Sequence, residues 1–188
     1  MRIPPASRSL VFALLLPFVV GCAAYSPAGK SFRHWRTGLR VTLPPGWLRY
    51  GAAKQDLMLT SDGLRLESIS ISLHRMGKKL PGTERTYRKE MLPAEVAELS
   101  LGLLESGGYA KNLRVERIGP VTVAGRDGYR ADALFVDGGG LTKRMRLYGT
   151  VLGEYVCEMR FEGAETVYYT KHLPAFEVMV ASASAGSR

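Results

Sequence analysis

The chain has 188 residues, of which 46% are hydrophobic and 23% charged, and its formal charge at pH 7 is +9. These proportions are those of an ordinary globular domain, so they exclude a disordered chain, a collagen-like repeat and a polytopic membrane protein. Two cysteines are too few to hold a small fold together with disulfides, and a chain of this length can bury a sufficient core without them.

The first 21 residues have the pattern of a signal peptide. Arg2 and Arg8 accompany an apolar run over residues 10–20, which as a helix spans about half of a bilayer core. Residues 19–21 (VVG) and Cys22 resemble the lipobox of bacterial lipoproteins, in which the cysteine thiol accepts a diacylglyceryl group. We expect lipidation of Cys22, the alternative being an ordinary cleaved signal. Ala23, in place of Asp, resembles the signal for sorting to the outer membrane, facing the periplasm.

The segment that follows the signal is basic. Removal of Arg2 and Arg8 lowers the formal charge from +9 to +7, and every charged residue before Asp56 is cationic. Residues 22–36 are predicted to be the lipidated N-terminus and a flexible linker. Four cations form a possible membrane-proximal basic patch: Lys30, Arg33, Arg36 and Arg40. Anionic lipid would attract such a patch, although a solvated linker and first strand would explain the same residues. We expect no nucleic acid partner in an envelope compartment.

Residues 37–183 are predicted to form one globular domain, with a frayed tail over 184–188. Apolar and polar residues alternate over 39–43 and stop at a Pro-Pro-Gly turn, which predicts a half-buried strand. Strands over 56–60 and 64–73, with turn residues 61–63 between them, predict a hairpin. The apolar positions of the second strand change parity near Glu67 and Ser68, so either a bulge lies there or the strand is covered on both sides.

A helix is predicted after residue 91. Leu92, Val96, Leu99 and Leu103 recur at helical spacing, Pro93 suits a first turn, and glycines at 107 and 108 end the pattern. Residues 83–91 are expected to form a turn or a short helix. A second helical stripe follows at the end of the domain, at positions 169, 173, 176 and 180.

The segment between the helices reads as antiparallel β structure. Strands are predicted over 113–118, 121–124, 128–136, 143–152 and 155–161, with turns at 125–128 and 137–140. A two-residue loop between the last two strands would place Leu147 opposite Arg160, so we expect a three-residue loop containing Gly153. In that register Glu158 and Glu162 face outward as cross-strand partners of Arg144 and Arg146.

The order of these elements resembles the Mog1/PsbP-like fold. The resemblance rests on residues 41–47 (VTLPPGW), on 121–130 (VTVAGRDGYR), and on the strand at 155–161 followed by the helix that contains Phe176. It covers residues from about 40 to 183. It implies an α+β domain, an α-β-α sandwich around a mostly antiparallel sheet, and proteins that act mostly by docking to partners. It carries over no functional residue.

The sequence offers no motif for catalysis, for a cofactor or for a metal. His34, His74 and His172 are far apart and lack the i, i+4 or Cys-x-x-Cys spacing of common metal sites, so each is expected to be a surface or hydrogen-bonded histidine. With Cys22 lipidated, Cys157 is expected to be a buried core thiol. No hydrolase, phosphate-loop or dinucleotide motif occurs.

Two functions remain open at this point. The first is a non-enzymatic lipoprotein of the bacterial envelope that docks to another envelope component, held to the membrane by its N-terminal lipid. The second is a carrier or sensor of an amphipathic or anionic ligand, such as a lipid or a glycan, in the periplasm. A hydrolase whose acidic side chains converge only in the fold ranks third.

Overall fold

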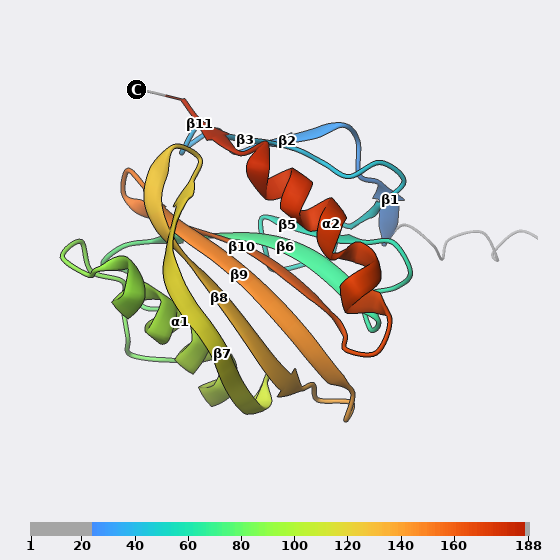
Figure 1. The fold of residues 1–188 in the computed structure, drawn as a ribbon. Coiled ribbons are helices and arrows are strands. Elements are labelled where there is room, and N and C mark those ends of the chain that lie inside the picture. Colours follow the sequence, from blue (N-terminus) through green and yellow to red (C-terminus); the bar gives the residue numbers. More distant parts are fainter. Residues whose placement is uncertain (1–23, 187–188) are drawn as a thin grey trace, which may run out of the picture.

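The computed structural model describes residues 24–186 (Figure 1). The predicted signal peptide and Cys22 lie outside the described residues. Over 24–186, no helix is both long and apolar enough to cross a membrane.

The centre of the fold is an eight-stranded antiparallel sheet with the order β1-β4-β5-β6-β10-β9-β8-β7. Each pair of neighbours in this sheet runs antiparallel, which confirms the α+β class with a mostly antiparallel sheet. Its strands are β1 (Tyr25–Pro27), β4 (Leu48–Tyr50), β5 (Leu57–Thr60), β6 (Glu67–Arg75), β7 (Lys111–Val123), β8 (Arg126–Val136), β9 (Thr142–Leu152) and β10 (Tyr155–Ala164).

The two helices of the described chain both coincide with predicted helices. Helix α1 (Pro93–Ser106) begins where the Glu95 carboxylate accepts the Leu92 backbone N–H at 2.7 Å, and it ends at Gly107. Leu92 is therefore an exposed cap residue outside the buried stripe. Helix α2 (Tyr168–Ala181) buries Phe176 and Met179. Residues 83–91 form turns, with an isolated bridge between Lys79 and Thr86.

The helices pack against separate parts of the main sheet, as Figure 1 shows, and each belongs to its own core. Helix α1 covers β7, β8 and β9, where Ala131, Phe135 and Leu147 are buried. Helix α2 covers β10, β9 and β6, where Phe161 and Ile71 are buried. We call the sheet face that carries Leu147 the α1 face and the face that carries Phe161 the α2 face.

Part of the predicted linker and tail is structured. A second sheet with the order β11-β3-β2 joins β2 (Ser31–Arg33), β3 (Leu39–Thr42) and β11 (Ser184–Ala185), and it shares the core of α2. β1 pairs with β4, where the rings of Tyr25 and Tyr50 lie 5.2 Å apart. β1, β2 and β11 are only two or three residues long, so no periodic pattern marks them in the sequence.

Strand β6 is covered on both sides, and this explains its change of apolar parity. It pairs with β10 from Glu67 to Arg75 without a register shift, so the first of the two alternatives, a bulge, is wrong. Residues 64–66 form a turn before the strand begins. Both Ile69 and Ser70 are buried although they point to opposite faces.

The loop between β9 and β10 has two residues, Gly153 and Glu154, because Leu152 is paired with Tyr155. The predicted three-residue loop is wrong. Leu147 does lie opposite Arg160, and the pairing is tolerated because this part of the α1 face buries hydrocarbon and charge side by side. Gly153 has a φ of +63°, which suits a tight hairpin turn.

The β7–β8 hairpin also turns within two residues. Ala124 and Gly125 both have positive φ, and Arg126 already belongs to β8, so the predicted turn at 125–128 is wrong. The two short strands predicted before this turn form one strand, β7, with two register shifts. Pro120 fits inside it because β7 lies at the edge of the sheet, where a missing N–H costs no ladder bond.

Candidate functional site

The predicted basic patch lies on the small sheet. Arg33 and Arg40 are directly opposite each other on β2 and β3, and both are exposed. Neither forms an ion pair with an acid within the described range 24–186. Lys30 precedes β2, and the Arg36 guanidinium lies 4.8 Å from the ring centre of Trp35 in the turn between the strands. The four cations thus follow one hairpin, and like charges oppose each other across it, which is unfavourable without an anion nearby.

The turn between β5 and β6 is built around Glu67. One carboxylate oxygen, Oε1, accepts hydrogen bonds from the Thr60 hydroxyl at 2.8 Å and from the backbone N–H groups of Ser61 and Asp62 at 2.7 Å each. Glu67 is fully buried. Three donors therefore fix the orientation of this carboxylate, and its position fixes the turn.

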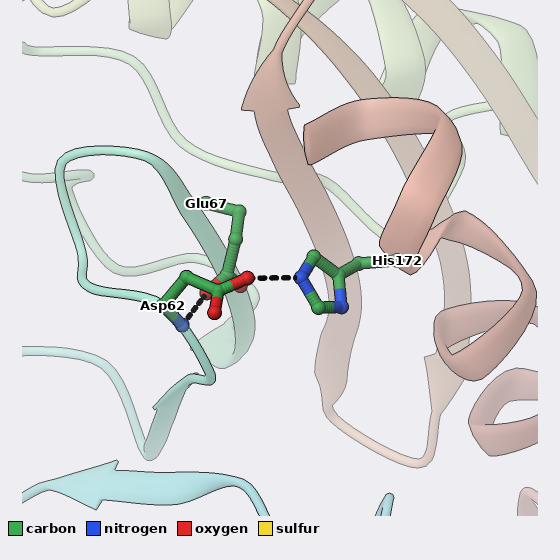
Figure 2. Close-up of side chains that lie close together, drawn as sticks. All are labelled: Asp62, Glu67 and His172. Carbon is green, nitrogen blue, oxygen red and sulfur yellow. Dashed lines mark hydrogen bonds and ion pairs between the residues drawn. The ribbon is translucent and has the colours of Figure 1, made fainter. Parts of the chain in front are cut away.

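Helix α2 brings a histidine to the same turn (Figure 2). His172 Nε2 lies 2.6 Å from Asp62 Oδ2, and Lys171 Nζ donates to the same oxygen at 2.6 Å. The edge of the Trp47 ring meets the His172 ring, with centroids 5.3 Å apart. Hydrogen bonds from Lys171 and then His172 lower the pKa of Asp62, and the hydrogen bond to Asp62 raises the pKa of Lys171.

Asp62, Glu67 and His172 therefore form a cluster in which one ligand atom from each residue lies within 4.8 Å of the others. The second oxygen of Glu67, Oε2, is buried and has no hydrogen-bond partner among the described residues. Two carboxylates and an imidazole are a ligand set that binds divalent transition-metal ions. The sequence does not indicate this cluster, because 110 residues separate Asp62 from His172 and no spacing links them.

A second polar cluster is buried on the α1 face. Glu158 Oε1 accepts hydrogen bonds from the hydroxyls of Tyr87 and Tyr129, both at 3.0 Å, and its other oxygen lies 3.6 Å from His74 Nε2. Ser100 of α1 bonds to both tyrosine hydroxyls. Burial alone would raise the pKa of Glu158, but the bonds from His74, Ser100 and Tyr129 outweigh burial and lower the pKa.

Glu162 continues this cluster toward the edge of the sheet. Lys143 Nζ lies 3.3 Å from Glu162 Oε1, Arg160 Nε lies 3.6 Å from Oε2, and the Tyr109 hydroxyl donates to Oε1. Lys143 and Glu162 are almost completely buried. Glu158 and Glu162 thus face inward, and the prediction that they face outward is wrong.

The predicted partners of these acids point to the opposite face. Arg146 bonds to Asp132 at 2.6 Å and to Glu177 of α2 at 2.8 Å. Arg144 bonds to Glu165 and to Glu116. The two-residue loop accounts for the difference, because a shift of one residue in register moves every side chain of β10 to the other face.

The α1-face cluster has little room for a substrate. The cavity beside Glu158 and Arg160 holds about 30 Å³, which is enough for one water molecule. The close approach of Tyr129 to this cluster depends on Gly149, because a Cβ at that position would lie 2.3 Å from the tyrosine ring. We conclude that these residues form a hydrogen-bonded polar layer inside the fold.

Cys157 is a buried core thiol, as predicted. Burial is the main cause that raises its pKa to about 12. The side chain is therefore a thiol at neutral pH, and it lacks the thiolate character that a nucleophile needs.

No protein-family profile and no curated protein sequence matches the chain. Solved structures do match it in fold. Cyanobacterial PsbP (CyanoP) from Synechocystis has a TM-score of 0.60 at 13% identity, covering 89% of this chain and 96% of that one. LpqN of Mycobacterium tuberculosis, described as involved in cell envelope biogenesis, has a TM-score of 0.56 at 10% identity, with coverages of 87% and 92%.

The Saccharomyces cerevisiae Ran-binding protein Mog1p matches with a TM-score of 0.53 at 12% identity, covering 84% of this chain and 95% of that one. Identities this low establish a shared fold and not a shared ligand. The three neighbours nevertheless agree with each other in architecture and span nearly the whole domain. The chain therefore carries a domain of the Mog1/PsbP-like fold.

Proposed function

We propose that this protein is a lipoprotein of the bacterial envelope that acts without catalysis, by docking to another envelope component. The observation that carries the proposal is the small number of residues between Cys22 and the first strand. β1 begins at Tyr25, three residues after Cys22, so a lipid on that thiol would hold the domain within about 10 Å of the bilayer. The outer membrane, on its periplasmic side, is the proposed location.

Charge and fold are compatible with this role. Arg33 and Arg40 oppose each other on an exposed face, where an anionic lipid surface or an acidic protein would relieve their repulsion. LpqN, which shares the fold, is described as taking part in cell envelope biogenesis, and Mog1p is described as a Ran-binding protein. A role in the envelope and the binding of a protein partner are thus each described for one protein of this architecture.

The sizes of the hollows favour docking to a partner over carrying a small ligand in an enclosed cavity. The most enclosed of the best hollows of the described residues holds about 30 Å³, far below the few hundred Å³ of a small-molecule site. The next most enclosed, beside Arg36, Arg126 and Tyr155, holds about 300 Å³, the lower end of that range. A carrier or sensor role stays as the second candidate because of one open hollow of about 540 Å³ between residues 84–91 and α1. Arg85, Arg88 and Met91 line it together with Glu84, Glu95 and Glu98, so it offers charges of both signs and an apolar side chain to an amphipathic ligand.

The anchor is tested by labelling cells with palmitate and separating their membranes. Cys22→Ser should lose both the label and the membrane location, whereas the matched cysteine variant Cys157→Ala should keep both. A Cys22→Ser protein that stays in the membrane fraction would contradict the anchor. For docking, cross-linking in intact cells through the native anchor should capture one protein partner reproducibly, and capture should fail for Cys22→Ser.

The carrier alternative predicts a different result from the same cells. Native mass spectrometry of the purified lipoprotein would then show a bound lipid or glycan, which Arg85→Glu with Arg88→Glu would release. Specific cross-links without such a ligand support docking.

A further inference from the structure

We infer that Asp62, Glu67 and His172 form a binding site for a divalent transition-metal ion of the Zn²⁺ class. The residues come from the β5–β6 turn, from the first position of β6 and from α2, and one ligand atom of each lies within 4.8 Å of the other two. The inference is independent of the proposed function.

The strongest sign of a ligand is the free oxygen of Glu67. Oε1 accepts three hydrogen bonds, whereas Oε2 is buried and has no partner among the described residues. A buried carboxylate oxygen without a donor is costly, and a cation is the partner that would satisfy it. In Figure 2 the Glu67 and Asp62 carboxylates lie against each other beside the His172 ring.

The site is also rigid, which favours metal binding. The three donors to Oε1 hold Glu67 in place, and one of them is the backbone N–H of Asp62 itself. His172 is buried on α2, and its ring packs edge-on against Trp47. A preorganised set of ligands loses little conformational freedom when an ion binds.

The ligand chemistry selects the class of ion. An imidazole nitrogen is a poor ligand for Ca²⁺ and Mg²⁺, which take oxygen ligands, and a common one for Zn²⁺. Three protein ligands would leave a fourth position for water, as in open zinc sites.

Lys171 sets the strength of binding. Its ammonium group donates to Asp62 Oδ2 at 2.6 Å and so occupies part of the coordination space of this carboxylate. A metal ion must displace that ammonium, and Lys171 is half-exposed, so it can turn into solvent. Removal of Lys171 should therefore tighten metal binding. A cluster that serves only to join the turn to the helix would gain no affinity for a metal from this substitution.

The experiment uses Trp47 as a reporter. The chain has two tryptophans, and Trp35→Phe in the full-length chain leaves only Trp47, whose ring lies 5.3 Å from that of His172. Co²⁺ substitutes for Zn²⁺ and quenches a nearby indole, so we expect saturable quenching of Trp47 that Zn²⁺ reverses. Isothermal titration with Zn²⁺ gives the affinity directly.

Matched variants in this background decide the outcome. His172→Gln should weaken Zn²⁺ binding at least about tenfold, while His74→Gln, which removes a histidine beside the carboxylate of Glu158, should leave it unchanged. Lys171→Ala should strengthen binding. Thermal unfolding with and without Zn²⁺ checks that each variant folds, and a rise in Tm with Zn²⁺ should be lost in His172→Gln alone.

The inference is overturned by any of three results. These are no quenching of Trp47 up to about 1 mM Co²⁺ in the Lys171→Ala background, equal binding by His172→Gln and His74→Gln, or weaker Zn²⁺ binding after Lys171→Ala.

Discussion

The two faces of strands β6 and β10 are both covered, yet they are chemically opposite. On the α2 face, Ile69, Ile71, Met159 and Phe161 form a hydrocarbon layer. On the α1 face the same strands carry serines at 68, 70 and 72 together with Glu158, Arg160 and Glu162. Burial and hydrophobicity therefore do not coincide in this sheet, and an alternating pattern identifies two faces without telling which one is inside.

The two faces are stabilised by different physics. Hydrocarbon burial on the α2 face is non-directional and depends on filled volume. The α1 face depends on specific partners, because a buried charge left alone costs several kcal/mol. Substitutions on the two faces should consequently differ in pH dependence and in their tolerance of isosteric change.

The largest effect is expected on the hydrocarbon face. Phe161→Ala removes a fully buried ring that lies 5.5 Å from Tyr169 and 5.7 Å from Phe176, and it should lower the free energy of unfolding by about 3–5 kcal/mol. Urea unfolding at pH 7 measures this free energy. Val178→Ala on the exposed side of α2 is the control and should change it by less than about 0.5 kcal/mol. A small loss for Phe161→Ala would mean that this face is not the packed core.

The second largest loss of stability is expected in the charged cluster of the α1 face. Glu162→Gln keeps the shape of the side chain but leaves Lys143 and Arg160 without their carboxylate, so we expect a loss of about 3 kcal/mol in the same experiment. Glu165→Gln removes a carboxylate of a half-exposed ion pair with Arg144 and should cost less than about 1 kcal/mol. Equal losses for the two variants would show that Glu162 is solvated.

The position of Tyr129 in the polar layer can be tested through Gly149. Gly149→Ala places a methyl group against the tyrosine ring and should cost about 1–3 kcal/mol as the ring moves away from Glu158. Gly138→Ala has no heavy atom within 4 Å of its new methyl group and serves as the matched control, with little or no loss. If both variants are equally stable, the ring has room that the packing does not indicate.

The smallest of the four effects should also be the one that depends on pH. The pKa of Glu158 is lowered in the folded state. Its contribution to the free energy of unfolding is therefore complete above the ordinary glutamate pKa of about 4.3, and it is lost as the pH falls through the lowered pKa. Glu158→Gln should therefore cost about 1–2 kcal/mol at pH 7 and less at pH 3. Glu154→Gln, in the exposed β9–β10 loop, is the control and should show no such trend. A loss of stability in Glu158→Gln that grows as the pH falls would contradict the lowered pKa of Glu158.

Much of the secondary structure could be predicted because it depends on neighbours in the sequence. Pro93 and Gly107 mark the ends of α1, and the alternation over 39–43 marks β3. The errors lie where two registers were both locally acceptable. Around Gly153, the three-residue loop aligned apolar residues with each other, but the structure pairs Leu147 with Arg160 because α1 also covers polar groups.

The candidate site was beyond prediction for a different reason. Glu67 lies at a position for which the sequence predicts a bulge or a doubly covered strand, and His172 is predicted to be a surface or hydrogen-bonded histidine. Only the packing of α2 on the β5–β6 turn brings their side chains together with Asp62. Convergence of residues this far apart leaves no trace in local spacing.

The sequence by itself determined the helices, most of the strands, the class of the fold and the basic character of the N-terminal hairpin. Each of these follows from periodicity, from turn residues and from charge, which act over a few residues. The tertiary structure decided which face of β10 meets α1, how Glu158 and Glu162 are paired, and that Asp62, Glu67 and His172 meet. These outcomes depend on register and on helix packing, where contacts distant in the chain compete and the best total burial of apolar and paired polar groups prevails.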